Sequence, residues 1–374
     1  MRASIAGAAL LIMMAMTGAP ARAVPAGEEG APAPGDHDLS LAFVGDIMGH
    51  EMNYRMADFH DIYRGIQDEI HSADLAFANL EFPLDPFRPS EGYPYFNGTP
   101  AYLAAAVDAG FNLFSIANNH AFDEGVEGIF QTARALERQR AAGRVLAYSG
   151  TRGNPWRPFE PEAVTVKGVR IGFVAVAQFL NESDGGRYVH VVDFADPAPA
   201  RAFVSWVHAI APLYDLFIVS YHGDREYVQV PSPAKRAFFL SLLDAGAQIV
   251  VGHHPHVVQG YEVVQTHGAR RVAMFSMGNF ISGMTGMLSP GQLRGALAAT
   301  GESYVLRVRV HCGPDGCSVA DADPLPIANY LDDKAQVVVG RLSDLADGTV
   351  KVSPEWRSYY AQRLALMREF LGIR

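Results

Sequence analysis

The sequence has few cysteines, no excess of positive charge and no long apolar run beyond its N-terminus. The 374 residues include two cysteines, 30 Lys and Arg, and 40 Asp and Glu, for a net charge of −10. An acidic surface disfavours non-specific attraction to nucleic acid or anionic lipid, so we expect no nucleic-acid partner. The acidic charge also disfavours an extended basic surface that binds a polyanion, although a local basic groove is still compatible with it. No later apolar run is long enough to predict a transmembrane anchor.

The two cysteines, Cys312 and Cys317, flank a tight turn at residues 313–316, between two strand-like runs. In an exported protein this arrangement predicts a disulfide that closes the hairpin. The alternative is a metal site, but His311 is the one further ligand nearby.

The N-terminus resembles an export signal rather than part of a fold. Arg2 precedes an apolar run and then Ala21-Arg22-Ala23, the pattern of a signal peptide over residues 1–23. Because there is no cysteine near this cleavage site, we expect no lipid anchor. Residues 24–38, rich in Pro, Gly, Ala and Glu, are expected to form a flexible linker. We therefore expect a periplasmic or secreted protein.

Strand-like and helix-like segments alternate over the first two thirds of the chain, which predicts an α/β domain over residues 39–330. The expected helices cover about 53–71, 100–109, 125–141, 197–211 and 233–245. Lys167-Gly168 signals a hairpin, and the strand-rich later part suggests a second sheet packed on the first. Residues 331–374 are expected to form a helical extension packed on the domain, with a helix beginning after the cap Ser353.

Polar side chains follow five predicted strands at the point where each strand ends. They are Asp46, Glu81, Asn119 with His120, His222, and the group His253, His254 and His256. Each alone has an ordinary explanation, such as a turn, a solvated loop acid or a core histidine. Strand ends of an α/β sheet converge on one edge, however, where sites usually form. A mixed set of oxygen and imidazole ligands suits Zn, Mn or Fe, so we expect one or two divalent ions there.

The sequence resembles the CapA family, the capsule and poly-γ-glutamate synthesis group. The residues that carry the resemblance are 45–48 (GDIM), 79–81 (NLE), 117–125 (ANNHAFDEG), 252–262 (GHHPHVVQGYE) and 276–280 (SMGNF). The match covers about residues 39–281. The family is in turn similar to calcineurin-like metallophosphoesterases. This resemblance implies a four-layer αββα fold, in which two β-sheets are flanked by helices and a metal site lies on one edge.

The resemblance also implies roles for individual residues. The metal ligands would be Asp46, Glu81, Asn119, His222, His254 and His256, with His253 a rival for one of the histidine positions. His120 would be the catalytic residue, protonating the leaving group or holding the oxyanion. Asp123 and Glu262 are expected to lie beside the ligands or to cap an element rather than to bind the metal.

Two departures from the family pattern affect the expected site. Met48 stands where the phosphoesterases place a metal-binding histidine, and His50 is two residues further on, so the pattern is compatible with a single ion. Residues 222–226 (HGDRE) replace the usual His-Trp-Gly-x-Glu. Glu226 matches, and Arg225 with Glu226 are candidate substrate contacts, the alternative for Arg225 being an ion pair with Asp224.

These observations lead to an expected function with an alternative. The first hypothesis is an exported metal-dependent hydrolase that cuts a phosphoester or amide in an anionic capsule or envelope polymer, with capsule-synthesis machinery as a candidate partner. The alternative is a non-catalytic protein that holds such a polymer during synthesis or export. A third interpretation, that these side chains form only a hydrogen-bonded structural rim, also stays open.

Overall fold

The computed structural model describes residues 36–158, 160–295 and 297–373. The expected signal peptide at 1–23 and residues 24–35 of the expected linker lie outside the described residues. The first strand, β1 (His37–Ile47), begins two residues before the predicted start, so His37 and Asp38 belong to the sheet and not to a linker. Among the described residues, no helix combines the length and the apolar character needed to cross a membrane.

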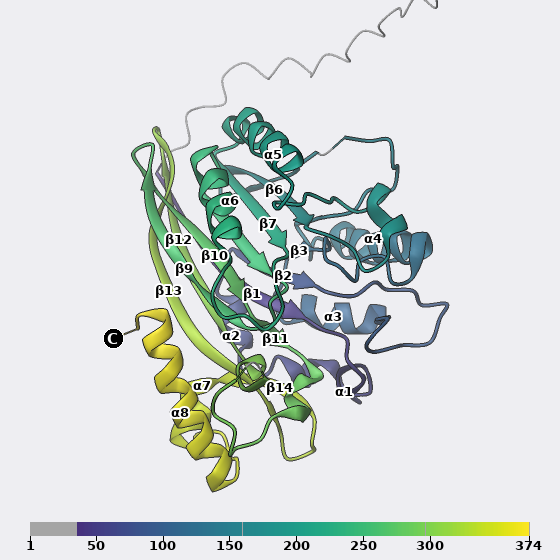
Figure 1. Cartoon of the computed structure of the whole chain (residues 1–374), viewed down its shortest axis with the longest axis vertical. Coiled ribbons are helices and arrows are strands. Elements are labelled where there is room, and N and C mark those ends of the chain that lie inside the picture. The colour runs from purple at the N-terminus through teal and green to yellow at the C-terminus, as the bar shows by residue number, and fades with distance from the viewer. Residues whose placement is uncertain (1–35, 159, 296, 374) are drawn as a thin grey trace, which may run out of the picture. The chain divides into compact units, whose positions relative to one another are not determined.

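Two mixed β-sheets form the centre of the fold (Figure 1). The larger sheet has the order β14-β13-β12-β1-β2-β3-β4, with β11 paired to β1. Its other strands are β2 (Leu75–Leu80), β3 (Leu113–Ser115), β4 (Ala147–Ser149), β11 (Asn279–Ile281), β12 (Glu302–Gly313), β13 (Gly316–Leu331) and β14 (Val337–Arg341). Strands β1 to β4 are parallel to one another, so their carboxyl ends lie at the same edge.

The smaller sheet has the order β5-β6-β7-β8-β10-β9. Its strands are β5 (Glu162–Val166), β6 (Val169–Ala177), β7 (Leu216–His222), β8 (Ile249–His253), β9 (Val258–Thr266) and β10 (Ala269–Met277). The predicted hairpin at Lys167-Gly168 is confirmed, because β5 and β6 are antiparallel neighbours there. The second sheet comes from the middle of the chain. The strand-rich later part, expected to form it, instead extends the first sheet through β12 and β13.

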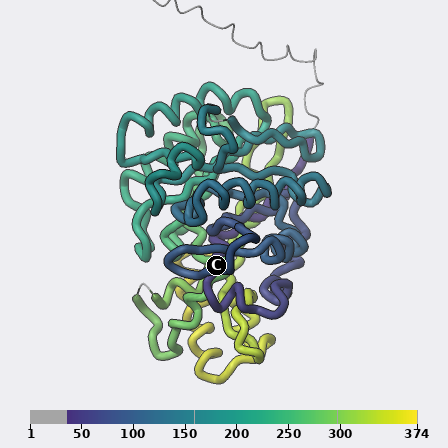
Figure 2. The backbone as a smooth tube through the Cα atoms, turned by 90° about the vertical axis from the view of Figure 1, so that its right-hand side faces the viewer, coloured from purple at the N-terminus to yellow at the C-terminus, as the bar shows by residue number. Residues whose placement is uncertain are grey.

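Alternating side chains explain why the sheets stack and why helices cover them. Leu41 and Phe43 of β1 pack between the sheets with Phe173 of β6, whereas Ala42 and Val44 face the helices on the outside. This alternation is the period of two that a strand requires. Helices α3 (Pro100–Asp108) and α4 (Gly125–Ala141) contribute to the outer core of the first sheet; α5 (Pro197–Ile210) and α6 (Pro233–Asp244) cover the second. Figure 2 is viewed from the right-hand side of Figure 1 and shows helical coils from the blue and teal parts of the chain. The expected two-sheet sandwich flanked by helices is confirmed.

The helix expected over 53–71 is wrong. The structure has three short pieces there: α1 (Glu51–Tyr54), a 3₁₀ turn at Phe59–Ile62 and α2 (Gln67–His71). The Asp58 side chain accepts from the His60 amide and starts a new turn. Gly65 then lies against β14, where an added Cβ would be 2.6 Å from the Val339 carbonyl oxygen. The remaining expected helices form within one residue of their predicted ends.

The C-terminal part is not wholly helical as expected. Residue 331 ends β13, and β14 adds the edge strand of the first sheet before α7 (Leu342–Asp347) and α8 (Pro354–Leu371). Ser353 caps α8 as predicted, and the helix packs against β13 and β9. The predicted disulfide joins Cys312 and Cys317, which face each other across the β12–β13 hairpin.

Candidate metal centre

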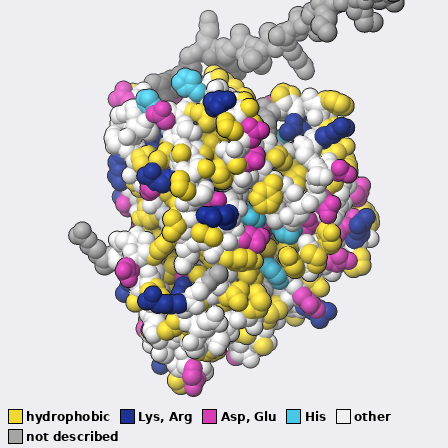
Figure 3. Space-filling model, viewed as in Figure 1, with side chains coloured by type: hydrophobic (Ala, Val, Ile, Leu, Met, Phe, Trp, Pro, Cys, Tyr) yellow, Lys and Arg dark blue, Asp and Glu magenta, His cyan; other side chains and the backbone are white. Residues whose placement is uncertain are grey.

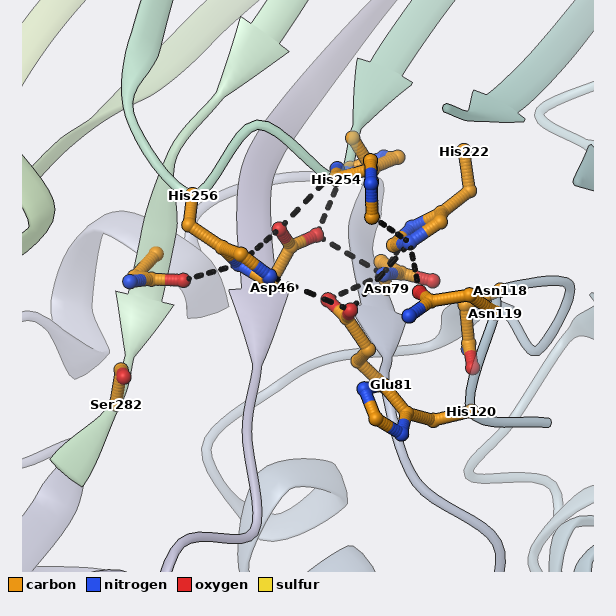
Figure 4. Close-up of polar contacts among 12 residues, drawn as sticks. Asp46, Asn79, Glu81, Asn118, Asn119, His120, His222, His254, His256 and Ser282 are labelled. Atoms are coloured by element: carbon orange, nitrogen blue, oxygen red, sulfur yellow. Dashed lines mark hydrogen bonds and ion pairs between the residues drawn. The ribbon is translucent and has the colours of Figure 1, made fainter. Parts of the chain in front are cut away.

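The polar strand ends predicted from the sequence lie together at one edge, where both sheets contribute (Figure 4). Asp46 belongs to β1, and Glu81 and Asn119 follow β2 and β3, the next two strands of the first sheet. His222 ends β7, and His254 and His256 follow β8 in the second sheet. All six side chains are buried.

Glycine permits the close approach that places Asp46. A Cβ on Gly45 would lie 1.8 Å from the Gly278 carbonyl oxygen, which accepts a hydrogen bond from the Asp46 amide. A Cβ on Gly252, just before His253, would lie 2.1 Å from the Phe275 oxygen. These glycines let neighbouring backbone segments meet where the site forms.

Asp46 is surrounded by imidazole and amide groups. Its Oδ1 lies 3.0 Å from His253 Nδ1 and accepts from Asn79 Nδ2 at 2.9 Å. Its Oδ2 lies 3.5 Å from His256 Nδ1. His256 Nδ1 is also 2.9 Å from Asn279 Oδ1, which orients the ring. Asp46 is thus held from several directions with no solvent around it.

His222 contacts candidate ligands from both sheets. Its Nε2 is 2.7 Å from Asn119 Oδ1, 3.1 Å from His254 Nδ1 and 3.4 Å from Glu81 Oε1. Glu81 Oε1 lies 3.8 Å from His256 Nε2. Several lone pairs therefore converge on one small space.

The two carboxyl groups respond to burial in opposite ways. Burial opposes ionisation of Asp46, but its interactions with His253 and His256 outweigh that effect and hold its pKa well below the usual range. Burial and the nearby charge of Asp46 raise the pKa of Glu81 well above its usual range. Without a cation, the site favours one ionised and one protonated carboxyl group.

Burial also affects the protonation state of the imidazoles. It lowers the pKa of His222 and of His254 well below the ordinary value, and a neighbouring imidazole adds to the effect in each case. For His256, burial has the same tendency, but the contact with Asp46 prevails and raises the pKa. His222 and His254 are therefore neutral near pH 7, the form in which imidazole binds metals.

The donor set fits a divalent cation. Three groups have ligand atoms within 4.8 Å of one another: Glu81 with His222 and His254, Glu226 with His254 and His256, and Asp46 with Glu81 and His256. Several buried atoms have no hydrogen-bond partner among the described residues: Glu81 Oε1, Asn79 Oδ1 and both ring nitrogens of His253. The His253 contact with Asp46 is close but not aligned as a hydrogen bond. A buried polar atom left unpaired costs about 1–3 kcal/mol, so these atoms indicate a missing partner.

Unusual backbone conformations coincide with the candidate ligands. His254 and His256 have φ values of 94° and 56°, and Asp224 and Tyr227 nearby have 90° and 59°. Non-glycine residues in this region cost on the order of 1–3 kcal/mol each and persist where the surroundings enforce them. The turns after β7 and β8 therefore hold strained residues at the site.

His120 lies beside the cluster with an oriented ring. Its Nδ1 is 2.7 Å from Asp123 Oδ2, and its ring meets the Phe96 ring edge-on at 4.6 Å. The Asn181 amide is 3.3 Å from the same Nδ1. Asp123 thus lies beside the site, as expected, whereas Glu262 pairs with Arg236 on the surface.

The departures from the family pattern have structural counterparts. Met48 packs in the outer core of the first sheet, and His50 is absent from the groups of candidate ligands among the described residues. The ion pair with Asp224, the alternative for Arg225, is not among the ion pairs of the described residues, and Asp224 accepts from the Ser232 amide at 2.9 Å. Arg225 is exposed.

Sequence reasoning missed three side chains that organise the site. Asn79 touches Asp46, Glu81 and His222, and its position near the end of β2, two residues before Glu81, was an available signal. Asn279 holds His256. Lys235 is fully buried and donates to the Gly223 carbonyl and to Gln259, and nothing in its local sequence marks it.

Comparison with known proteins settles the family. A family model described as "Bacterial capsule synthesis protein PGA_cap" matches residues 40–284, more than half of the chain. The chain belongs to this family. The matched range of this PGA_cap chain contains every candidate ligand from Asp46 to His256, together with Asn279. The resemblance to CapA proteins that the motifs indicated is therefore confirmed.

Two curated relatives carry the CapA name. The capsule biosynthesis protein CapA of Bacillus anthracis is 26% identical over 313 residues, covering 77% of this chain and 67% of the relative. The PGA biosynthesis protein CapA of Bacillus subtilis (strain 168) is 26% identical over 253 residues, covering 66% and 64%. The chain thus spans about two thirds of the length of these relatives.

Solved structures give weaker likenesses to this PGA_cap chain. A hypothetical protein from Thermus thermophilus has a TM-score of 0.44 at 18% identity, covering 77% of this chain and 98% of that one. A structure described as a novel phosphatase, from Mycoplasma pneumoniae, has 0.45 at 13% identity, covering 78% and 94%. Scores this low do not establish a common fold, and they do not bear on what this chain binds.

Proposed function

We propose that this capsule synthesis family member is an exported, metal-dependent hydrolase that cuts a phosphoester or amide bond in a capsule or envelope polymer. The observation that carries the proposal is the buried cluster of imidazoles and carboxyl groups, in which His222 and His254 are neutral near pH 7. Glu81 Oε1 has no hydrogen-bond partner among the described residues and lies 3.4 Å from His222 Nε2. Export rests on the signal-like N-terminal sequence.

The ligand assignment follows from the contacts. Asp46, Glu81, Asn119, His222, His254 and His256 would hold the ion or ions, with His253, 3.0 Å from Asp46, a rival for one of the histidine positions. Zn, Mn or Fe suits this mixture of oxygen and nitrogen donors. A divalent cation there would supply Lewis-acid polarisation of the scissile group and lower the pKa of the attacking water.

The chain's own residues would orient the reaction. Asp123 fixes the His120 ring through Nδ1, and Nε2, which lies 3.5 Å from the Asn181 amide, would deliver a proton to the departing group. Asn79 keeps Asp46 in place, and Asn279 does the same for His256. Arg225 and Glu226 remain candidate substrate contacts, and Glu226 is also within ligand distance of His254 and His256.

The test is metal content together with turnover. We expect mass spectrometry to find at least one equivalent of Zn, Mn or Fe in the purified chain. Aryl phosphates or γ-glutamyl amides should be hydrolysed, and chelation should abolish the reaction. Asp46→Asn and His254→Ala should lose both metal and turnover. A chain without metal, and without turnover after incubation with each ion, would refute the proposal.

A polymer-binding protein without catalysis is the second candidate. Met48 packs in the apolar core where the resembling phosphoesterases place a histidine ligand, so this position adds no donor. The result that selects this candidate is a tightly held ion with no hydrolysis of either substrate class.

A further inference from the structure

Glu226 lies on the turn that follows β7 and comes within ligand distance of two histidines of the metal centre. Its carboxylate forms a group with His254 and His256 in which the ligand atoms lie within 4.8 Å of one another. Both histidines are buried, whereas Glu226 is exposed. Figure 3 shows histidine side chains at the surface near the middle of the face, with acidic side chains beside them. Glu226 is thus placed to bind either the substrate or a cation.

Hydrogen bonds fix the turn that presents Glu226. The Tyr227 amide donates to the carbonyl of Pro255, the residue between the two histidines, at 2.8 Å. At the start of the turn, the Gly223 amide donates to the His253 carbonyl at 3.1 Å. The turn is therefore bonded to the same segment that carries the candidate histidine ligands. A carboxylate held in this way binds without the entropic cost of ordering a loose loop.

Buried side chains hold the same turn from the inside. Lys235 Nζ donates to the Gly223 carbonyl at 3.0 Å and to Gln259 Oε1 at 3.2 Å. The Gln259 amide in turn donates to the Val228 carbonyl at 2.7 Å. The turn is thus supported on both sides of Glu226. A carboxylate that only met solvent would not need a backbone fixed in this way.

The buried donors divide into two positions that share Glu81. The first position consists of Glu81, His222 and His254. Asn119 Oδ1 lies 2.7 Å from His222 Nε2 and adds a fourth donor there. Transition-metal ions in proteins are usually held by four or more ligands, so the first position is complete.

The second position has fewer donors. It consists of Asp46, Glu81 and His256. Met48, where the resembling phosphoesterases place a histidine, packs in the outer core of the first sheet instead. Glu226 is within ligand distance of His256 and can supply the fourth donor.

His253 is the other candidate for the fourth donor. Its Nδ1 lies 3.0 Å from Asp46 Oδ1, and its ring stacks on Phe77 with the ring centres 5.4 Å apart. Among the described residues, His253 belongs to none of the groups whose ligand atoms converge. Its place favours contact with Asp46 over contact with an ion, which leaves Glu226 as the donor for the second position.

The negative charge of Glu226 also acts on the second position. It adds to the raised pKa of Glu81, after burial and the charge of Asp46. Without a cation, carboxylates this close repel one another, whereas a divalent ion among them attracts all three. The charge and the number of donors therefore favour the same role for Glu226.

We propose that Glu226 is a metal ligand that completes the second position, so that the chain binds two divalent ions with Glu81 contributing to both. This inference rests on the proposed function for the presence of a metal. It replaces the role of Glu226 as a substrate contact with that of a ligand. Because Glu226 is exposed and the donors of the first position are buried, the second ion should bind more weakly than the first.

The test is titration of Mn²⁺ into the full chain after chelation and dialysis, with Mn²⁺ followed by electron paramagnetic resonance. We expect the wild type to bind two equivalents, and the second to produce the signal of a spin-coupled pair. In Glu226→Gln the first equivalent should bind as in the wild type and the second at least about tenfold more weakly. Groups that only orient a metal ligand already contribute about 10–100-fold to metal affinity.

Two other variants frame this result. Glu51→Gln neutralises an exposed carboxylate that belongs to none of the ligand groups among the described residues, and it should bind both ions as the wild type does. Asp46→Asn removes the ionised carboxylate within the cluster and should lose both ions. Glu226→Gln should therefore differ from both variants by losing one ion and keeping the other.

A wild type that binds a single equivalent would overturn the inference, and so would a Glu226→Gln variant that keeps the second ion. If that variant keeps both ions and has a raised KM for an aryl phosphate, Glu226 is a substrate contact and not a ligand.

Failure of this inference is distinguishable from failure of the proposed function. Metal-dependent turnover in a chain whose metal content does not depend on Glu226 would refute the ligand assignment alone. Two ions whose binding depends on Glu226, without hydrolysis of a phosphoester or an amide, would refute the hydrolase and leave the ligand assignment standing.

Discussion

His120 is the residue whose replacement should separate catalysis from metal binding. We expect His120→Ala to retain its metal, because the ring belongs to none of the ligand groups among the described residues. Turnover should fall about 10²–10⁴-fold, the usual contribution of a general acid. The loss should be larger for phenyl phosphate than for p-nitrophenyl phosphate, since the better leaving group needs less help from a proton. Steady-state kinetics and mass spectrometry measure both quantities.

Asp123→Asn and His267→Ala are the matched comparisons for that prediction. The first removes the carboxylate 2.7 Å from His120 Nδ1 and should lower turnover less than loss of the ring. The second removes an imidazole on an exposed hairpin and should have no effect. Full turnover in His120→Ala would remove this residue from the mechanism.

Lys235 carries a second prediction at the scale of a single residue. Burial lowers its pKa to about 7, although Asp224 and Asp46 oppose the shift. Between that value and its ordinary pKa of 10.5, the unfolded chain keeps a proton that the folded chain has released. The free energy of unfolding therefore rises with pH over this range because of Lys235, and the gain is lost as pH falls towards 7.

The variant Lys235→Met should lack this pH dependence. The unfolding free energy of the wild type minus that of the variant should increase from pH 7 to pH 10, by at most on the order of 4 kcal/mol. Denaturant titrations at several pH values measure this slope, which is independent of the hydrogen bonds that the variant also loses. The exposed Lys351→Met is the control and should show no such slope. Equal slopes for both variants would mean that Lys235 keeps an ordinary pKa.

At the scale of an element, the end of β1 depends on a glycine. A Cβ at Gly45 would overlap the Gly278 carbonyl, which is backbone and has no side-chain rotamer that could relieve the overlap. We expect Gly45→Ala to push β1 from the segment before β11, displace Asp46 and reduce metal content. It should also destabilise the chain by about 1–3 kcal/mol, as overpacking does. Thermal unfolding and metal analysis measure the two effects.

Gly186→Ala is the control for this substitution. Nothing lies within 4 Å of a Cβ at Gly186. This variant should keep its metal and its stability. If Gly45→Ala behaves like Gly186→Ala, the contact between β1 and Gly278 does not position Asp46.

Elements whose structure depends on their own residues were predictable from the sequence. The apolar run Ile249 to Val251 forms β8 as predicted, and the parallel order of neighbouring strands brings His222 and His254 to one edge. Helix α4 forms over residues 125–141, as its sequence pattern predicted. These candidate ligands were predictable because strand ends in an α/β sheet converge on one edge. That prediction needs only local sequence patterns and parallel pairing of the strands.

Elements that depend on distant partners were not predictable. Gly65 interrupts the expected helix because it lies against β14, which is far away in the sequence. Residues 337–339, three valines, become the edge strand only because β13 is there to pair with them. Lys235 has the pattern of an exposed charge in the first turn of α6, and the Gly223 carbonyl that receives it comes from a separate loop. In each of these cases, contacts with residues far away in the sequence determine the structure.

At the scale of the whole molecule, the candidate ligands come from both sheets. Asp46, Glu81 and Asn119 belong to the first sheet, and His222 and His254 to the second. A cation bound by both sets would therefore connect the carboxyl edges of the two sheets. The apolar core between the sheets provides the other connection. Metal binding should accordingly stabilise the sandwich as a unit.

We expect chelation to lower the melting temperature by several degrees, and saturating Mn²⁺ or Zn²⁺ to restore it. A ligand at about 100 times its Kd adds about 2.7 kcal/mol to the free energy of unfolding. Hydrogen exchange should slow on metal binding at the ends of both β1–β2 and β7–β8, because the ion would hold residues of both sheets. Asp46→Asn should respond to neither chelation nor added metal.

A surface site could imitate this stabilisation, and the chain offers a candidate. His60 lies 2.7 Å from Asp58 and 3.0 Å from Asp108 in an exposed cluster. His60→Ala removes that cluster and should keep the full response to metal, since the sheets do not meet there. If His60→Ala loses the response and Asp46→Asn keeps it, the stabilising ion binds at the surface. If exchange slows in one sheet only, the ion does not connect the two sheets.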